Sequence, residues 1–429
     1  MLDFFRKNSF KKFFITIGIL ALYKIAMMIM IPGIDMDSLP QLSSKSGFLD
    51  TLNVFSGGSI DNCSILATNI MPYITATIIT QMLCSKSIGI EYFQNLKKDK
   101  EIGDMKKHEW TQYFTVIVAF INACYISKVL CNNVQNGVNT VYTSNGLFYL
   151  IAIPAMIAGS LFCVWIANRI SKSGIGQGVS VLIFANIVSN SASSFKKIYD
   201  LYVNSVISFN YLLAIVIFFL SLFFIIIYVE ACVVYFPTRY TGVVGKNIDQ
   251  KLPLKINNSG VMPAILASSL AHVPTMIIGF LEFLNFQTAT LNKYASIISS
   301  NGSLYYIFNA VLIFTFTTTQ SEITFDPEEI AYSLKESGAV IKDVRPGEDT
   351  KNLLEKVLSK LNFISGIYLV FVCVLSEYFC NYFNQVIGEK VLQLSGTSVL
   401  ILVSTAKLVF EGIRNYNYKE IIQKMITTK

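Results

Sequence analysis

Long apolar segments are the feature that most constrains how this chain can fold. A helix needs about 20 mainly apolar residues to cross a bilayer, and only 14% of the 429 residues are charged, against roughly 25% in a soluble domain. We therefore expect an all-α polytopic membrane protein. The sequence predicts ten transmembrane helices, at Phe13–Ile31, Ile65–Leu83, Gln112–Leu130, Leu147–Ala167, Ile175–Val188, Tyr211–Val229, Val261–Leu281, Leu304–Ile323, Leu361–Phe379 and Ser395–Phe410.

The lysines and arginines orient these ten segments. If the N-terminus is cytoplasmic, 26 of the 34 basic residues fall on the cytoplasmic side and 5 fall outside. Cytoplasmic loops carry the excess of positive charge in membrane proteins, so both termini are expected in the cytoplasm. The first segment lacks a small-residue cleavage site and contains Lys24, which favours a first helix over a signal peptide.

The stretch before the second span is too polar for lipid. It reads FSGGSIDNCSILATN from Phe55 to Asn69, and the fifth span also begins at glycine-rich sequence. Broken or short helices occur in membrane proteins where they line a cavity, because lipid cannot satisfy their free backbone groups. These two segments therefore indicate an internal cavity.

Catalytic and metal-binding patterns are missing from the sequence. The eight cysteines fall mostly in or beside apolar segments without a C-x-x-C pair, and His108 and His272 belong to no H-E-x-x-H motif. Walker A, G-x-S-x-G and G-x-G-x-x-G patterns are not found either. We expect a protein without enzymatic activity, metal or cofactor.

Six segments, in order, resemble the SecY family, which forms the channel of the bacterial-type Sec protein translocon. They are IPGIDMDSL (Ile31–Leu39), NVFSGGSIDNCSILATNIMPYITATIITQML (Asn53–Leu83), GIGQGVSVLIFANIV (Gly174–Val188), LPLKINNSGVMPAILASSL (Leu252–Leu270), FDPEEIAYSLKESGAVIKDVRPGEDT (Phe325–Thr350) and GTSVLILV (Gly396–Val403). The resemblance implies two inverted, pseudo-symmetric halves of five helices, residues 1–200 and 201–429, around a central hourglass pore. It places the hinge between them near Ser194–Asn210.

The resemblance also implies a pore ring and a plug. The ring of branched apolar side chains, which would seal the pore to ions by dewetting, matches Ile70, Ile74, Val179, Ile183, Ile265 and Ile401. The plug would be a short helix at about 55–69, folded into the outer funnel, with Gly57, Gly58, Ser59, Ile60, Ile65 and Leu66 among its residues. A lipid-facing or core role for the isoleucines, and a re-entrant segment without a sealing role, are the alternatives.

A lateral gate and two cytoplasmic loops complete the implied site. Thr75, Asn122 and Asn257 would hold the gate closed through weak hydrogen bonds, with ordinary helix packing as the alternative. Loops 230–260 and 324–360 would contact a ribosome or a SecA-like motor ATPase, and Arg345 matches the family's key arginine. The earlier loop departs from the family because most of its arginines are missing and Pro237 ends any helical extension. The ribosome or motor is therefore expected to contact mainly residues 324–360.

The resemblance implies a passive channel that translocates unfolded polypeptides and releases hydrophobic segments into membrane lipid. Its partners would be SecE-like and SecG-like small subunits, the motor or ribosome, and the signal sequences of its substrates, in the inner (plasma) membrane or an organellar membrane. A secondary transporter built on inverted repeats is the alternative. It is disfavoured because the spans offer almost no ionisable residues apart from Lys24 and Lys407 to bind a coupling ion. An intramembrane protease is disfavoured by the missing catalytic pair.

Overall fold

The computed structural model of the 429-residue chain is predominantly helical. It describes residues 2–34, 56–60, 62–84, 92–93, 100–131, 134–135, 138–139, 145–174, 176–204, 207–240, 249–271, 273, 277–278, 281, 303–341, 344–387 and 396–407. Parts of the predicted seventh span and of the cytoplasmic loop 230–260 lie outside these residues, as do Phe55 and Asp61 of the predicted plug.

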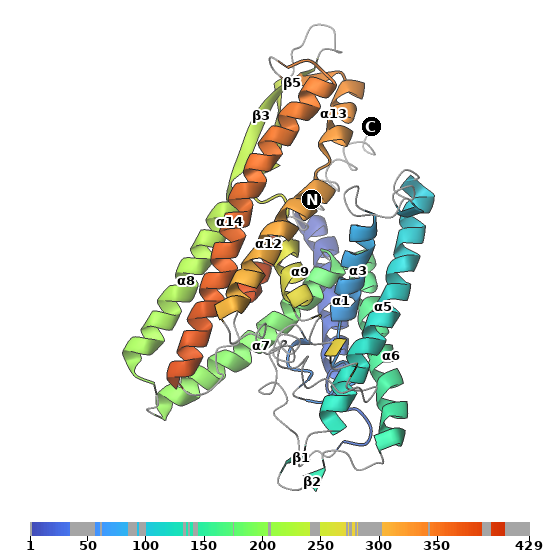
Figure 1. Ribbon diagram of the computed structural model, residues 1–429, viewed down its shortest axis with the longest axis vertical. Helices are drawn as coiled ribbons and strands as arrows, with labels where there is room; N and C mark the ends of the chain where they lie inside the picture. The colour runs from blue at the N-terminus through green and yellow to red at the C-terminus, as the bar shows by residue number, and fades with distance from the viewer. Residues whose placement is uncertain are drawn as a thin grey trace.

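The helices form two groups joined by α7. The bounds are α1 Leu2–Ala26, α3 Met71–Leu83, α5 Lys100–Cys131, α6 Asn145–Ser173, α7 Gly178–Val203, α8 Phe209–Ala231, α9 Met262–Ala271, α12 Ser303–Thr324, α13 Pro327–Glu336 and α14 Glu348–Ile387. Helices α1, α3, α5 and α6 lie together on one side, and α8, α12 and α14 lie on the other (Figure 1). Helix α7 crosses between the groups, and it remains helical through the first half of the predicted hinge.

Among the residues that the structure describes, five helices are long and apolar enough to cross a membrane. They are the helices at Met105–Cys131, Gly146–Ser173, Gly178–Val203, Phe209–Ala231 and Glu348–Ile387, and they coincide with the third, fourth, fifth, sixth and ninth predicted spans. Helix α3 has 13 residues, and the apolar helices Met262–Ala271 and Gly396–Lys407 are also short. The chain is therefore a multi-pass membrane protein in which several apolar helices are shorter than a bilayer-spanning helix.

The expectation of an all-α chain is wrong outside the membrane helices. Strands β3 (Val233–Tyr240), β4 (Asp249–Lys255) and β5 (Ala339–Ile341) form an antiparallel sheet in the order β4-β3-β5. A β1–β2 hairpin (Val134–Gln135, Val138–Asn139) lies at the opposite end of the molecule (Figure 1). The run VVYFPT favours a strand because β-branched and aromatic residues suit a pleated surface.

Pro237 stands within β3 at a position that tolerates it. Proline cannot donate a hydrogen bond to a neighbouring strand and is confined to unpaired edges. Pairing of β3 with β5 begins only at Thr238, opposite Ile341. Pro237 is therefore paired on one side only, with β4, and its other side has no β5 residue opposite it. The sheet joins the two predicted cytoplasmic loops, 230–260 and 324–360, into one structural unit.

The segment 324–360 is also largely ordered. Asp326 caps α13 by accepting the backbone N–H of Glu328 at 3.1 Å, and β5 follows before α14 begins at Glu348. Such an N-cap satisfies one of the free N–H groups of the first helical turn. The predicted cytoplasmic loop 324–360 therefore consists largely of a short helix, a strand and the first turns of α14.

Candidate pore and plug

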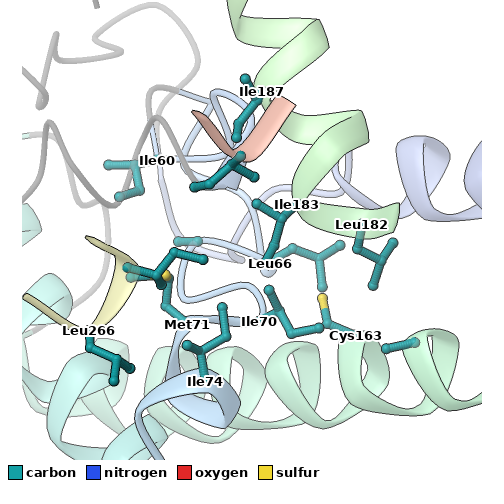
Figure 2. Packing of buried hydrophobic residues seen from close by; sticks show 14 of the residues in the cluster. Ile60, Leu66, Ile70, Met71, Ile74, Cys163, Leu182, Ile183, Ile187 and Leu266 are labelled. Carbon is teal, nitrogen blue, oxygen red and sulfur yellow. The ribbon is translucent and has the colours of Figure 1, made fainter. Parts of the chain in front are cut away.

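The six predicted ring residues all belong to one continuous apolar cluster. Five of them (Ile70, Ile74, Ile183, Ile265 and Ile401) are buried, and Val179 is partly buried against the same cluster. They come from the start of α3, from α7, from α9 and from the helix Gly396–Lys407. Figure 2 shows Ile70, Ile74 and Ile183 gathered with Ile60 and Leu66 of the predicted plug. Elements far apart in the sequence therefore bring ring and plug residues into one cluster.

The local sequence explains how the start of α3 presents two of these residues. Helix α3 begins at Met71, with Pro72 in its first turn, where the missing N–H costs nothing. The N–H of Ile70 donates to the side-chain oxygen of Asn69 at 2.7 Å. Because residues four apart share one face of a helix, Ile70 and Ile74 lie on the same side.

The described residues of the predicted plug from Gly57 to Asn69 form a series of turns, whereas Ser56 just before them is helical. In the described residues from Gly57 to Ile70, turns and bends alternate with a single bridge, Ser64 to Met30. Positive φ angles occur at Gly57 (67°), Gly58 (88°), Cys63 (44°) and Asn69 (49°). Left-handed conformations interrupt a right-handed helix, so the helical expectation is wrong for the described residues from Gly57 to Asn69.

Backbone hydrogen bonds tie this segment to the chain that follows α1. The N–H of Ile31 donates to the carbonyl of Cys63 at 2.9 Å, and the N–H of Ile65 donates to the carbonyl of Ile29 at 3.0 Å. Ser59 donates to the carbonyl of Leu66 at 3.0 Å within the segment itself. The turns are therefore held by specific bonds although they form no regular element.

Close approaches also seat the segment against α6 and α7. A Cβ atom on Gly57 would lie 2.9 Å from Oδ1 of Asn186, and one on Gly159 would lie 2.4 Å from the carbonyl oxygen of Ile65. Thr68 donates to the carbonyl of Met156 at 3.2 Å. Glycine is needed at these contacts because any side chain would separate the two backbones.

A buried polar network connects the end of this segment to α1 and α7. Tyr23 donates to Oδ1 of Asn186 at 2.9 Å and accepts a hydrogen bond from Nδ2 of Asn69. Asn69 also donates to the carbonyl of Ser56 at 3.2 Å. All four residues are fully buried. We call Tyr23, Asn69 and Asn186 the polar triad. The sequence indicates it only through the amides of Asn69 and Asn186, which lie inside two predicted apolar spans.

The three predicted gate residues form no hydrogen bonds with one another in the described part of the chain. Thr75 donates to the carbonyl of Met71 in its own helix. Asn122 is buried, and its Oδ1 has no partner among the described residues. Asn257 binds Glu230 and Ser365 at 2.9 and 3.1 Å, so it links elements within residues 201–429.

A buried ion pair lies beside Asn257. Lys407 lies 3.4 Å from Oε2 of Glu230 and also donates to the Glu230 backbone carbonyl. Glu230 is 9% exposed, and Asn257 donates to its other carboxylate oxygen, so both oxygens are bound. The sequence analysis named Lys407 as one of the few ionisable residues of the spans, but it did not predict Glu230 as its partner.

The statement that the spans hold almost no other ionisable residue is wrong for Glu377. This residue lies within α14, where Asn309 of α12 donates to its carboxylate at 3.3 Å. Nearby, Asn381 donates to the hydroxyl of Tyr306 at 2.7 Å. These bonds join α12 to α14. The described residues contain no group of three or more His, Cys, Asp or Glu side chains that could hold a metal ion.

Arg345 lies on an exposed turn between β5 and α14. Its backbone carbonyl accepts a hydrogen bond from Thr350 at 2.8 Å, which fixes the turn against the first residues of α14. Because β5 pairs with β3, this turn is attached to the sheet that follows α8.

The architecture belongs to one fold class, the helical fold seen in solved structures of protein-conducting channels. A solved structure described as "The structure of a protein conducting channel" superposes with a TM-score of 0.68 at 18% identity, covering 95% of this chain and 93% of that one. Sec61 in a canine ribosome-channel complex from the endoplasmic reticulum gives a TM-score of 0.62 at 16% identity, covering 95% and 93%. At these identities the likeness establishes the fold.

The sequence comparisons identify the family. The SecY family model matches residues 64–409. The protein translocase subunit SecY of Rickettsia felis is 32% identical, over 96% of this chain and 95% of its own length. The corresponding subunit of Helicobacter pylori is 33% identical, over 92% and 93%. The chain belongs to the SecY family, and the transporter and protease alternatives are thereby set aside.

Proposed function

We propose that this chain is the pore-forming subunit of a channel that moves unfolded polypeptides across the bacterial inner membrane. Ten helices in two inverted halves would surround an hourglass pore, with both termini in the cytoplasm. The family membership and the fold support this proposal. The observation that carries the mechanism is the single apolar cluster that contains all six ring residues together with Ile60 and Leu66.

The ring would act as a compressible seal. Branched apolar side chains exclude water from a narrow constriction and thereby block ions, while their lack of fixed bonds lets any peptide side chain pass. The plug segment would cover this ring until a substrate displaces it. A solved structure of similar fold (TM-score 0.64, 18% identity, covering 95% of this chain and 92% of that one) is described as showing that the plug of the SecY protein stabilises the closed channel and maintains a membrane seal.

The lateral exit would open between α3 and α9. The two helices touch each other far less than α3 touches α5 or α9 touches α12. Thr75 and Asn257 each form their hydrogen bonds with residues of their own group of helices. Few hydrogen bonds between the groups would therefore need to break when the groups separate. Hydrophobic segments of the substrate would leave into lipid along this seam.

Partner proteins would hold the two groups of helices together and supply the energy for translocation. A SecE-like subunit, with or without a SecG-like one, would clamp the two groups of helices together. A SecA-like motor or a ribosome would dock at Arg345 and the β4-β3-β5 sheet and provide the energy. Co-purification of a small membrane subunit would test the first of these interactions, and loss of motor or ribosome binding in Arg345→Glu would test the second.

The pore itself is tested by reconstituting the complex into liposomes and measuring ion conductance and protein import. Replacing Ile74 or Ile183 with glycine should raise the resting ion leak or relax selectivity for signal sequences, because the ring loses a seal-forming side chain. Ile217→Gly is the matched control, since Ile217 lies on α8 with its side chain 57% exposed. Unchanged conductance in both ring variants would contradict the ring assignment.

A further inference from the structure

The short stretch that follows α1 is fastened to that helix. We call residues 27–31 the strap. The N–H of Met27 donates to the carbonyl of Tyr23 at 3.1 Å, and the N–H of Ile29 donates to the carbonyl of Ala26 at 3.2 Å. Such bonds tighten the last turn of a helix and use its free carbonyl groups. The strap and α1 therefore form one unit.

Apolar burial also fixes the strap. Met27 and Ile31 are 5% and 2% exposed, and both belong to the apolar cluster that contains the ring residues. Side chains in a close-packed interior cannot shift without opening voids. The strap is therefore the stationary side of the contact that it makes with the proposed plug segment.

An antiparallel bridge joins the strap to the proposed plug segment. Met30 of the strap lies opposite Ser64 of the segment. The two backbone hydrogen bonds described above, at 2.9 and 3.0 Å, stand on either side of this pair and join the neighbouring residues. Met30 and Ser64 are therefore a non-hydrogen-bonded pair, the kind in which facing residues approach each other most closely.

Two side-chain bonds of the proposed plug segment also end on the first group of helices. Thr68 donates to the carbonyl of Met156 in α6, and Asn69 donates to the hydroxyl of Tyr23 in α1. The proposed lateral exit lies between this group and α9. These two bonds and the bridge to the strap therefore lie on one side of the exit, and separation of the two groups breaks none of them.

We propose that the strap is a latch, which holds the proposed plug segment in place while the lateral exit opens and releases it only when a polypeptide crosses the membrane. A hydrophobic substrate segment that leaves between α3 and α9 does not disturb the bridge. A polypeptide that passes the ring pushes the segment aside and breaks both backbone bonds to the stationary strap. The inference rests on the proposed function, because it assigns a regulatory contact to the proposed pore.

A disulfide across the bridge tests the latch. Facing residues of a non-hydrogen-bonded pair have Cα atoms about 4.5 Å apart, a separation that a disulfide can span. The double variant Met30→Cys/Ser64→Cys is reconstituted with its partners and treated with diamide, which oxidises the two thiols to a disulfide and takes up their two hydrogen atoms. Mass spectrometry confirms the crosslink. Translocation of a secreted polypeptide and insertion of a membrane protein with one apolar segment are then measured.

The crosslink should reduce translocation at least tenfold and leave insertion within twofold, and dithiothreitol should restore translocation. The single variants Met30→Cys and Ser64→Cys are the matched controls and should not respond to diamide. Unchanged translocation, an equal loss of both activities, or a similar response of a single variant would overturn the proposal. Failure of the double variant to crosslink would also overturn it, because the bridge would then be absent. If the wild type handles neither substrate, it is the proposed function that fails.

A second measurement follows the latch in a channel without a crosslink. Ser64 is fully buried, so Ser64→Cys should react slowly with a maleimide in the resting channel, measured against the wild type and its native cysteines. A secreted polypeptide stalled in the pore should raise the rate at least fivefold, whereas a stalled membrane segment should leave it unchanged. Asn204→Cys, at the exposed end of α7, should be labelled equally in all states. Equal labelling of Ser64→Cys with the two stalled substrates would overturn the proposal.

Discussion

The hydroxyl of Tyr23 donates a 2.9 Å hydrogen bond to Asn186, which joins α1 to α7 across 163 residues of sequence. Asn69 completes the polar triad from the end of the proposed plug segment. A buried hydroxyl and two buried amides are costly unless they satisfy one another. The triad therefore makes the position of the plug segment depend on both helices at once.

Removing the Tyr23 hydroxyl should loosen the proposed plug segment. In Tyr23→Phe the two amides lose their shared partner, and we expect a loss of stability of about 1–3 kcal/mol. The resting ion leak of reconstituted channels should rise as well. Both are measurable, as a lower thermal midpoint in detergent and as a higher conductance in bilayers. Tyr228→Phe is the control, because Tyr228 is 72% exposed on α8. Equal effects of the two substitutions would contradict the prediction that the polar triad holds the segment in place.

Gly57→Ala should unseat the plug more than Gly58→Ala. Both glycines have positive φ angles, so alanine carries a similar backbone cost at each. Only the Gly57 Cβ would press on Asn186, at 2.9 Å, whereas the Gly58 Cβ would lie 3.8 Å from Asn190. The ion leak should therefore be larger for Gly57→Ala. Identical conductances would show that the contact with Asn186 does not matter.

Deleting Gly57–Thr68 should leave a folded but leakier channel. The deletion removes the bonds from Cys63 and Ile65 to the chain after α1 but keeps Ser56, Asn69 and the helices themselves. We expect a normal yield in membranes, a monodisperse complex in detergent and an increased resting conductance. A deletion variant that fails to fold would favour a purely structural role for the segment.

Breaking the Glu230–Lys407 pair should destabilise the junction between α8 and the last described helix. Lys407→Met leaves a carboxylate that is only 9% exposed without its cation. Loss of one partner of a buried pair costs up to about 3–5 kcal/mol, and the partial exposure of Lys407 argues for the lower end. The double variant Glu230→Gln/Lys407→Met should recover most of the thermal midpoint. No recovery would mean that the charges are not coupled.

Hydropathy and motif matching predicted the parts of the structure that depend on local composition. The burial of Ile74 and Ile183 follows from apolar side chains on helices of an internal bundle. The long helices α5, α6 and α14 follow from continuous apolar runs. These features need no knowledge of which segment lies next to which.

The rest depended on long-range partners. Nothing near Tyr23 in the sequence indicates Asn186, and nothing near Asn257 indicates Ser365 at 3.1 Å. The left-handed turns at Cys63 and Asn69 are sustained by tertiary contacts, since neither residue prefers that conformation as glycine does. Strand β5 is only three residues long and is defined by its pairing with β3.

The β4-β3-β5 sheet has a mechanical consequence. Strand β3 continues from the end of α8, and the turn that carries Arg345 connects β5 to α14. A force applied to Arg345 is therefore divided between two long membrane helices through the three residue pairs that join β3 to β5. A force on this turn would therefore act on α8 and α14 together rather than on one loop alone.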